Sequence, residues 1–339
     1  SMAEEDVVEK ADEVEDTEEE ALQLEESSVH VLVQEEVAAG LSNLGRVANG
    51  QSFAFLNATI SGLDLTDISI LKEFKNLQKI DVSSNLLKQV SVLGELPHLT
   101  SLNASYNHLT AILDFLPPRN LREADLSHNR ITEMNDISAH RFLSKLNLDD
   151  NEIRMISGVQ QCTCLRVLSL NHNFIQEISN LDNLPLRELH LEQNSIELFE
   201  NMETLTCLQI LSVQDNQITS LRGLESLSML NDLNLKQNGV RSLSEMAYIN
   251  KLPVLERLVV EGNPVTGLEC YRLQLLHAVP GLVVLDDVEV CAEEKVATDN
   301  FHDPDHPQYQ DTIRHDAQDL PPSLFVSPLN ETQATTTEA

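Results

Sequence analysis

The sequence predicts an α/β solenoid, in which short repeats stack side by side and their parallel strands form one sheet. An eleven-residue pattern, L-x-x-L-x-L-x-x-N-x-[LIV], occurs nine times between residues 77 and 265. Its asparagines follow one another at intervals of 22, 22, 22, 22, 21, 22, 22 and 25 residues. These asparagines are Asn85, Asn107, Asn129, Asn151, Asn173, Asn194, Asn216, Asn238 and Asn263. The pattern and the period are those of the leucine-rich repeat.

Each repeat begins with a short strand. Side chains alternate between the two faces of a strand, so the leucines of the L-x-L core point to the same side. One repeat cannot bury that side by itself, and stacking gives a continuous apolar core under a parallel sheet. The second half of the repeat has apolar residues three apart, as in Ile153, Ile156 and Val159. This spacing predicts a 3₁₀ or helical return segment.

The asparagine of each repeat marks the point where the strand ends and the chain turns. Its amide provides two donors and an acceptor, which can satisfy backbone groups of the turn that no strand pairs. We therefore expect the asparagines to be structural residues. Function is expected from the positions between them.

The N-terminal end of the stack requires a cap, because an open end exposes the core. Val33, Val37, Leu41 and Leu44 have the spacing of one helical face, and residues 29–54 are predicted to form a helical cap. The repeats are predicted over residues 55–265. The first of them is degenerate, since Leu63 stands where the other copies have asparagine.

A second cap is predicted at residues 266–290. The last repeat is 25 residues long and leaves room for an additional helical turn within Ser244–Asn250. The cap pattern that follows consists of Tyr271, Arg272, Leu273, Leu276, Pro280, Leu282, Leu285 and Asp286. It is similar to the segment that ends many intracellular leucine-rich-repeat proteins.

Acidic tails flank the predicted repeats. The chain of 339 residues has a formal net charge of −33. Residues 1–28 and 291–339 are acidic or rich in Pro and Thr, with few apolar residues, and are predicted to be disordered. The negative charge argues against nucleic acid or an anionic membrane as a partner. No stretch is apolar enough to span a bilayer and no signal peptide is visible, so an intracellular location is expected.

The sequence offers no convincing chemical centre. The five cysteines fit a reducing compartment, and Cys162 occupies a leucine position of the core. His128 and His172 share one column of the repeats but lie two strands, or about 10 Å, apart, too far to share one zinc ion. His140 also stands in a core position. We predict no enzyme activity, no metal, no cofactor and no small-molecule substrate.

A protein-binding surface is expected on the concave face of the sheet, where the side chains between the strand leucines point outward. The early repeats are small and polar there, while the middle repeats carry Val167 and Ile210 among charges. The predicted partner-binding residues are Tyr106, His128, Lys145, Asn147, Asp149, Asp150, Val167, His172, Glu188, His190, Glu192, Ile210 and Arg257. The alternative is a solvated face that binds nothing.

The C-terminal tail contains an apolar island, the segment Leu320–Pro328 (LPPSLFVSP). Such a segment within polar sequence is typical of a short docking motif that becomes ordered on binding. A chance cluster of apolar residues is the alternative.

Two longer segments resemble a known family. NGQSFAFLNATISGLDLTDI (49–68) and LSEMAYINKLPVLERLVVEGNPVTGLECYRLQLLHAVPGLVVLD (243–286) are similar to the leucine-rich repeat-containing protein 23 family, which are ciliary radial-spoke components. The 22-residue period also resembles that of the type-1 phosphatase regulator, the U2 A-prime protein and axonemal dynein light chain. The C-terminal tail departs from the first family, because it is broken by prolines where a charged helical extension is expected.

The resemblance implies a non-catalytic scaffold of the axonemal radial spoke in cilia and flagella. Its concave face and tails would contact neighbouring proteins of the spoke. The alternative is a regulatory subunit of a type-1 protein phosphatase or another intracellular leucine-rich-repeat adaptor. In that case, acidic residues such as Glu188 and Glu192 are expected to make the contacts.

Overall fold

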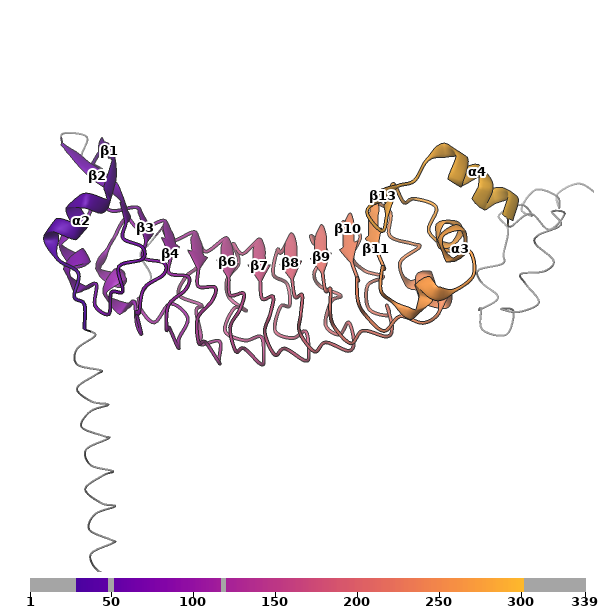
Figure 1. Ribbon diagram of the computed structural model, residues 1–339, viewed down its shortest axis with the longest axis horizontal. Coiled ribbons are helices and arrows are strands. Elements are labelled where there is room, and N and C mark those ends of the chain that lie inside the picture. The colour runs from indigo at the N-terminus through magenta and orange to yellow at the C-terminus, as the bar shows by residue number, and fades with distance from the viewer. Residues whose placement is uncertain (1–28, 48–51, 117–119, 302–339) are drawn as a thin grey trace, which may run out of the picture. The chain divides into compact units, whose positions relative to one another are not determined.

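The computed structural model describes residues 29–47, 52–116 and 120–301. It separates into two compact units, Ser1–Arg130 and Ile131–Ala339, called unit 1 and unit 2 below. Unit 1 contains α2 (Gln34–Gly40), β1 (Leu41–Arg46), β2 (Phe53–Thr59), β3 (Lys79–Asp81), β4 (Ser101–Asn103) and β5 (Glu123–Asp125). Unit 2 contains β6 (Lys145–Asn147), β7 (Val167–Ser169), β8 (Glu188–His190), β9 (Ile210–Ser212), β10 (Asp232–Asn234), β11 (Arg257–Val259), α3 (Tyr271–Ala278), β12 (Val284–Leu285), β13 (Val288–Glu289) and α4 (Ala292–Phe301) (Figure 1).

Each unit is a parallel-sheet solenoid, which confirms the predicted fold class. In unit 2 every strand from β6 to β9 pairs in parallel with the strand of the next repeat, so that Leu146 lies opposite Leu168. Both leucines have no exposed surface, while Lys145 and Asn147 on either side of Leu146 point to the opposite face. The period-two alternation of the sequence therefore determines the register.

The return segments are 3₁₀ helices at the ends and turns in the middle. The 3₁₀ helices are η1 (Ser69–Glu73), η2 (Ser91–Glu95), η3 (Leu243–Tyr248) and η4 (Pro264–Gly267). In the 21- and 22-residue repeats of unit 2 the same stretch is built from hydrogen-bonded turns, such as the bond from Cys162 N to Val159 O. The longer last repeat has room for η3, as its extra residues predict.

The N-terminal cap differs from the predicted helix. Helix α2 ends at Gly40, and the helical positions predicted for Leu41 and Leu44 are wrong, because both residues lie in β1. A Cβ atom at residue 40 would lie 2.2 Å from the carbonyl oxygen of Thr59, so the close packing there needs glycine. β1 pairs antiparallel with β2, and this hairpin covers the edge of the parallel strands.

The degenerate first repeat is present in the predicted register. Ala58 of β2 lies opposite Ile80 of β3, 22 residues further on. Leu63 replaces the asparagine, but the N–H groups of Leu63 and Leu65 both donate to Asn85 Oδ1 at 3.1 Å. The next repeat therefore satisfies the turn of the first one.

The C-terminal cap extends beyond the predicted boundary at residue 290. Helix α3 begins at Tyr271, whose hydroxyl donates to Asp286 Oδ2 at 2.7 Å. Helix α4 follows the β12–β13 hairpin and is held by Arg272, which donates to Glu294 Oε1 at 2.6 Å. The ten residues of α4 were predicted as tail because their own apolar surface is small, and contact with α3 is what stabilises them.

Two predicted features lie outside the described residues: the acidic tail 1–28 and the remainder of the C-terminal tail, which includes Leu320–Pro328. Within the described ranges, no helix has both the length and the apolar character needed to cross a membrane.

Candidate protein-binding surface

The repeat asparagines connect neighbouring repeats. Asn173 Nδ2 donates to the carbonyl oxygens of Leu148 (3.0 Å) in the preceding repeat and of Leu170 (3.1 Å) and Asn171 (3.0 Å) in its own. Its Oδ1 accepts from Ile153 N at 3.0 Å. This pattern recurs at the other repeat asparagines of unit 2, most of which are buried. Their structural role leaves the sheet face to carry the functional residues.

The residue before each asparagine adopts a left-handed backbone conformation. The φ angles are 54° at Asp150 and His172, 51° at Gln193 and 53° at Asp215. Gly262 takes the same place with φ 77°. These residues turn the chain out of the strand, and non-glycine side chains adopt this conformation at a cost of about 1–2 kcal/mol. The position is therefore partly structural, although Asp150 and His172 were predicted as binding residues.

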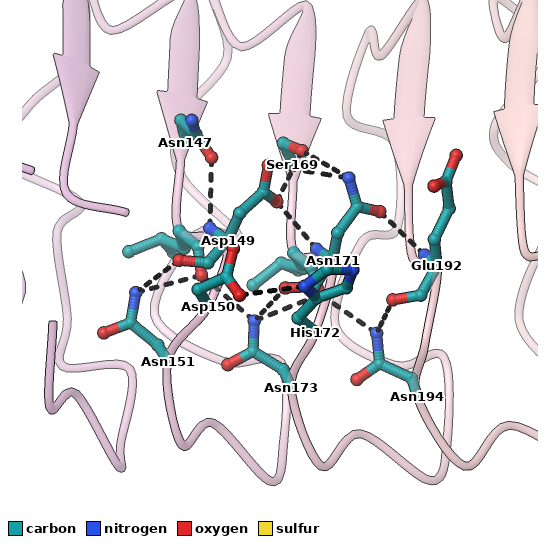
Figure 2. Close-up of polar contacts among 12 residues, drawn as sticks. Asn147, Asp149, Asp150, Asn151, Ser169, Asn171, His172, Asn173, Glu192 and Asn194 are labelled. Atoms are coloured by element: carbon teal, nitrogen blue, oxygen red, sulfur yellow. Dashed lines mark hydrogen bonds and ion pairs between the residues drawn. The ribbon is translucent and has the colours of Figure 1, made fainter. Parts of the chain in front are cut away.

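A line of hydrogen bonds crosses the middle strands of unit 2 (Figure 2). Asp149 Oδ1 accepts from Ser169 Oγ at 2.6 Å and from Asn171 N at 2.7 Å, both in the next repeat. Asn171 Oδ1 accepts from Glu192 N at 2.7 Å, one repeat further. Glu192 Oε1 accepts from Ser212 Oγ at 2.5 Å. Polar side chains just beyond the strand ends thus cap the backbone of the repeat that follows.

A local turn is found at the strand ends of unit 1, and it recurs in unit 2, where Asn147 Oδ1 accepts from Asp149 N at 3.0 Å. The side-chain oxygen of Asp125 accepts from N and Oγ of Ser127 at 3.0 and 2.7 Å, two residues along the same chain segment. Asp81 with Ser83 and Asn103 with Ser105 repeat this Asx turn. The small polar residues of the early repeats are thus explained by local backbone capping.

Burial raises the pKa of Asp149, and the adjacent charge of Asp150 raises it further. The hydrogen bonds from Ser169 and Asn171 act in the opposite direction. Desolvation is the larger effect, since the carboxylate is half-buried between neighbouring strands. The Asp149 carboxylate is therefore engaged by the next repeat and is not a free ligand for a partner.

The face of the unit 2 sheet opposite the leucine core is called the sheet surface below. Its strand residues are Lys145, Asn147, Val167, Ser169, Glu188, His190, Ile210, Ser212, Asp232, Asn234, Arg257 and Val259. Glu188 pairs with Val167 on one side and with Ile210 on the other, so two apolar side chains flank one carboxylate. All three residues are half-buried. This is the most apolar part of the surface predicted to bind a partner.

Polar side chains near this apolar part lie in pairs. His172 Nδ1 lies 2.8 Å from Asp150 Oδ1, and His190 Nε2 lies 3.7 Å from Glu188 Oε2. Arg257 contacts Asp287 at 2.5 Å and Asp232 at 3.7 Å. Asp232 and Asp287 were not among the predicted binding residues. Asp232 lies on the strand next to that of Arg257, and Asp287 lies in the C-terminal cap. An incoming carboxylate would compete with both for Arg257.

Tyr106 and His128 form a separate feature within unit 1. Their rings stack with centroids 3.9 Å apart and planes at 15°, and Tyr106 is 55% exposed. Both residues have left-handed φ angles, which align the two rings at the spacing of the strands. The other eleven predicted binding residues all belong to unit 2.

The side chains that could bind a metal ion or undergo redox chemistry do not cluster in the described residues. No group of three or more His, Cys, Asp or Glu residues is placed to hold a metal ion in the described part of the chain. All five cysteines are free thiols. Cys162 is buried as its leucine position predicts, and burial raises its pKa to about 11, which keeps the thiol protonated.

Comparisons with known proteins agree with the fold. Residues 186–313 match the family model described as leucine-rich repeat. A human leucine-rich repeat and guanylate kinase domain-containing protein is 45% identical over 74 residues, which are 22% of this chain and 9% of that protein. The U2 small nuclear ribonucleoprotein A' of Candida albicans (strain SC5314) is 34% identical over 73 residues, 21% of this chain and 31% of the relative. The matches thus span less than a third of either relative.

A solved structure extends the likeness over more of the chain. A leucine-rich-repeat protein of Leptospira interrogans superposes with a TM-score of 0.59 and 26% identity, covering 68% of this chain and 59% of the other. The fold of this chain is therefore that of leucine-rich-repeat proteins. Proteins with this fold are typically non-catalytic interaction modules.

Proposed function

We propose that this chain is a non-catalytic protein-interaction scaffold that binds a protein partner on the sheet surface of unit 2. The observation that carries the proposal is the parallel register of Val167, Glu188 and Ile210, which places two half-buried apolar side chains on either side of a carboxylate. A partner that covers them removes apolar surface from water, at about 25 cal/mol per Å².

The charged pairs around these residues supply specificity. His190 lies beside Glu188 and His172 beside Asp150, so the edge of the apolar part is polar on several sides. An apolar centre with a polar rim is the common arrangement of protein interfaces. Asp149 and Glu192 accept hydrogen bonds from the hydroxyls of Ser169 and Ser212 in the next repeats and so link neighbouring strands of this surface.

We place this scaffold in the axonemal radial spoke of cilia or flagella. The support is the similarity of residues 49–68 and 243–286 to a family of ciliary spoke components. The second of these segments contains η3, β11 and α3, which form the last repeat and the start of its cap. Its length and cap residues distinguish it from the generic repeats.

Proximity labelling in ciliated cells tests the proposal. The full chain fused to a labelling enzyme is expected to mark radial-spoke proteins and to localise to the axoneme. The variant Val167→Asp with Ile210→Asp is expected to lose most of the labelled partners. Met155→Asp is the matched control, because Met155 is 61% exposed but lies in a return segment outside the sheet surface.

Three results would contradict parts of the proposal. Absence of the chain from cilia would exclude the spoke assignment and leave the scaffold. A labelled set that contains a type-1 phosphatase catalytic subunit, and that is lost on Glu188→Gln, would support the alternative regulatory role. Partners that remain unchanged in the double variant would exclude the sheet surface as the binding site.

A further inference from the structure

Unit 2 carries an exposed apolar stripe that the sheet surface does not include. It consists of the residues that immediately precede the first leucine of each repeat, and is called the ridge below: Phe142, Cys164, Pro185, Cys207, Met229 and Val254. Phe142 is 58% exposed, Met229 47% and Val254 39%. The leucine that follows each ridge residue is almost fully buried, so the ridge side chains are on the side away from the core.

The ridge residues occupy equivalent places in successive repeats. In four of the six repeats the N–H of the following leucine closes the same turn, as in the bonds from Leu143 N to His140 O and from Leu208 N to Leu205 O. At about 4.8 Å per repeat, the six residues extend over roughly 24 Å. The corresponding positions of unit 1 are polar: Asn76, His98 and Asn120. An uninterrupted apolar stripe is thus a property of unit 2 and not of the repeat itself.

Three arginines accompany the ridge. Arg166 Nη1 donates to the carbonyl oxygen of Pro185 at 3.4 Å, so its guanidinium lies between two ridge positions. Arg141 directly precedes Phe142, and Arg187 lies beside Arg166, with its N–H donating to Arg166 O at 2.8 Å. None of these three arginines forms an ion pair with a carboxylate of the described residues. In a chain with a net charge of −33, this edge attracts an acidic and apolar ligand.

We propose that the ridge binds the chain's own C-terminal segment Leu320–Pro328. That segment presents Leu320, Leu324, Phe325 and Val326 within nine residues. Residues 302–319, which precede it, contain five aspartates and one arginine and therefore complement the basic edge. At about 3.3 Å per residue, Leu320 to Val326 spans roughly 20 Å when extended, close to the length of the ridge.

The chain between α4 and Leu320 is long enough for the segment to reach the ridge. Phe301 ends α4 in unit 2, and eighteen residues separate it from Leu320. Extended, they reach up to about 60 Å, more than twice the length of the ridge. A tether of this length gives an effective concentration near the millimolar range, so that even a weak site is occupied. Another protein that binds the ridge would first have to displace this segment.

Cys207 provides a direct readout, because it is an exposed thiol in the middle of the ridge. The experiment measures the alkylation rate of each cysteine by mass spectrometry in the full chain. Cys270 is exposed outside the ridge and serves as the internal reference. The tail variant Leu324→Asp with Phe325→Asp is expected to increase the Cys207 rate several-fold relative to Cys270. Ala334→Asp, which adds charge outside the segment, is expected to leave the ratio unchanged.

A ridge variant and a peptide test the same contact from both sides. Phe142 lies three repeats from Cys207. The Phe142→Ser variant is expected to raise the ratio of the Cys207 to the Cys270 alkylation rate, as the tail variant does. A synthetic peptide of residues 316–328, added to the tail variant, is expected to restore protection, and its Leu324→Asp form is not. Equal Cys207 rates in wild type and tail variant would overturn the proposal. Protection that disappears on dilution of the protein would also overturn it, since the occupant would then be a second copy.

Discussion

The Oδ1 atom of Asn173 accepts a hydrogen bond from the backbone N–H of Ile153, twenty residues earlier, at 3.0 Å. The amide nitrogen of the same side chain donates to carbonyl oxygens of both repeats. Each asparagine thus satisfies its own turn and the turn before it. The repeats are joined by polar contacts as well as by the leucine core, and the stability of one repeat depends on the next.

Replacement of this asparagine should therefore be costly. Asn173→Leu keeps a similar volume but leaves buried donors and acceptors without partners, and is expected to lower the free energy of unfolding by about 1–3 kcal/mol. Urea denaturation measures the difference. Asn173→Asp keeps the acceptor and removes the donors, and its free energy of unfolding is expected to lie between those of wild type and Asn173→Leu. The adjacent Phe174→Ser is the control, since Phe174 is 56% exposed. An unchanged midpoint in Asn173→Leu would refute the role of the asparagine.

The left-handed backbone conformation of the residue before each repeat asparagine predicts a stabilising substitution. Gln193 has φ 51° and an exposed side chain. Gln193→Gly relieves a strain of about 1–2 kcal/mol and costs about 0.5–1 kcal/mol of chain entropy, so a gain of up to about 1.5 kcal/mol is expected. Gln193→Val is expected to destabilise. Gln217→Gly, at an exposed position without positive φ, should destabilise by about 0.5–1 kcal/mol. Thermal unfolding that ranks Gln193→Gly below wild type would contradict this account.

The half-buried carboxylate of Asp149 predicts a pH dependence of stability. Its pKa is raised in the fold above the ordinary value of 3.8, first by burial. The folded state then binds the proton more tightly than the unfolded state, so the free energy of unfolding decreases as pH rises from about 4 through the raised pKa. The wild type should gain stability relative to the Asp149→Asn variant as pH falls from 7 to 4. A constant difference between the two across this range would show that burial does not penalise the carboxylate.

The C-terminal cap predicts an alkaline effect. Burial and the hydrogen bond to Asp286 raise the pKa of Tyr271 from 10.0 to about 12. Stability associated with the protonated phenol is complete below pH 10 and is lost as pH rises toward 12. The Tyr271→Phe variant should lack this loss, and Asp286→Asn should shift it to lower pH. Urea denaturation between pH 9 and 12 measures the slopes, and parallel profiles for wild type and Tyr271→Phe would contradict the assignment.

Much of the fold was predictable because it repeats. A period of 22 residues and a two-residue alternation leave one register for strands such as β6 and β7, and the structure has that register. The N-terminal helix was predicted too long, because the spacing of Val37, Leu41 and Leu44 is that of one helical face. Pairing with β2 and the close approach at Gly40 decide in favour of the strand, and neither is local in sequence.

The candidate site was predictable only as a face. Column positions identified Val167, Glu188 and Ile210 as neighbours, because parallel strands place equivalent residues side by side. The capping role of Asp149 was not visible, since its partners Ser169 and Asn171 lie 20 and 22 residues away in the sequence. The ridge was missed for a related reason: each of its residues is ordinary alone, and the stripe exists only when six repeats are aligned.

The sequence by itself determined the repeat, its period and the division between core and surface, because these depend on the chemical type of residues at regular spacing. The tertiary structure alone decided which surface residues are engaged. Arg257 is exposed, yet it contacts Asp287 in the cap, 30 residues away. Glu192 holds Ser212 of the next repeat, whereas Val167 and Ile210 have no polar role. Contacts between repeats determine these differences, because hydrogen bonds and burial depend on distance in space and not on place in the chain.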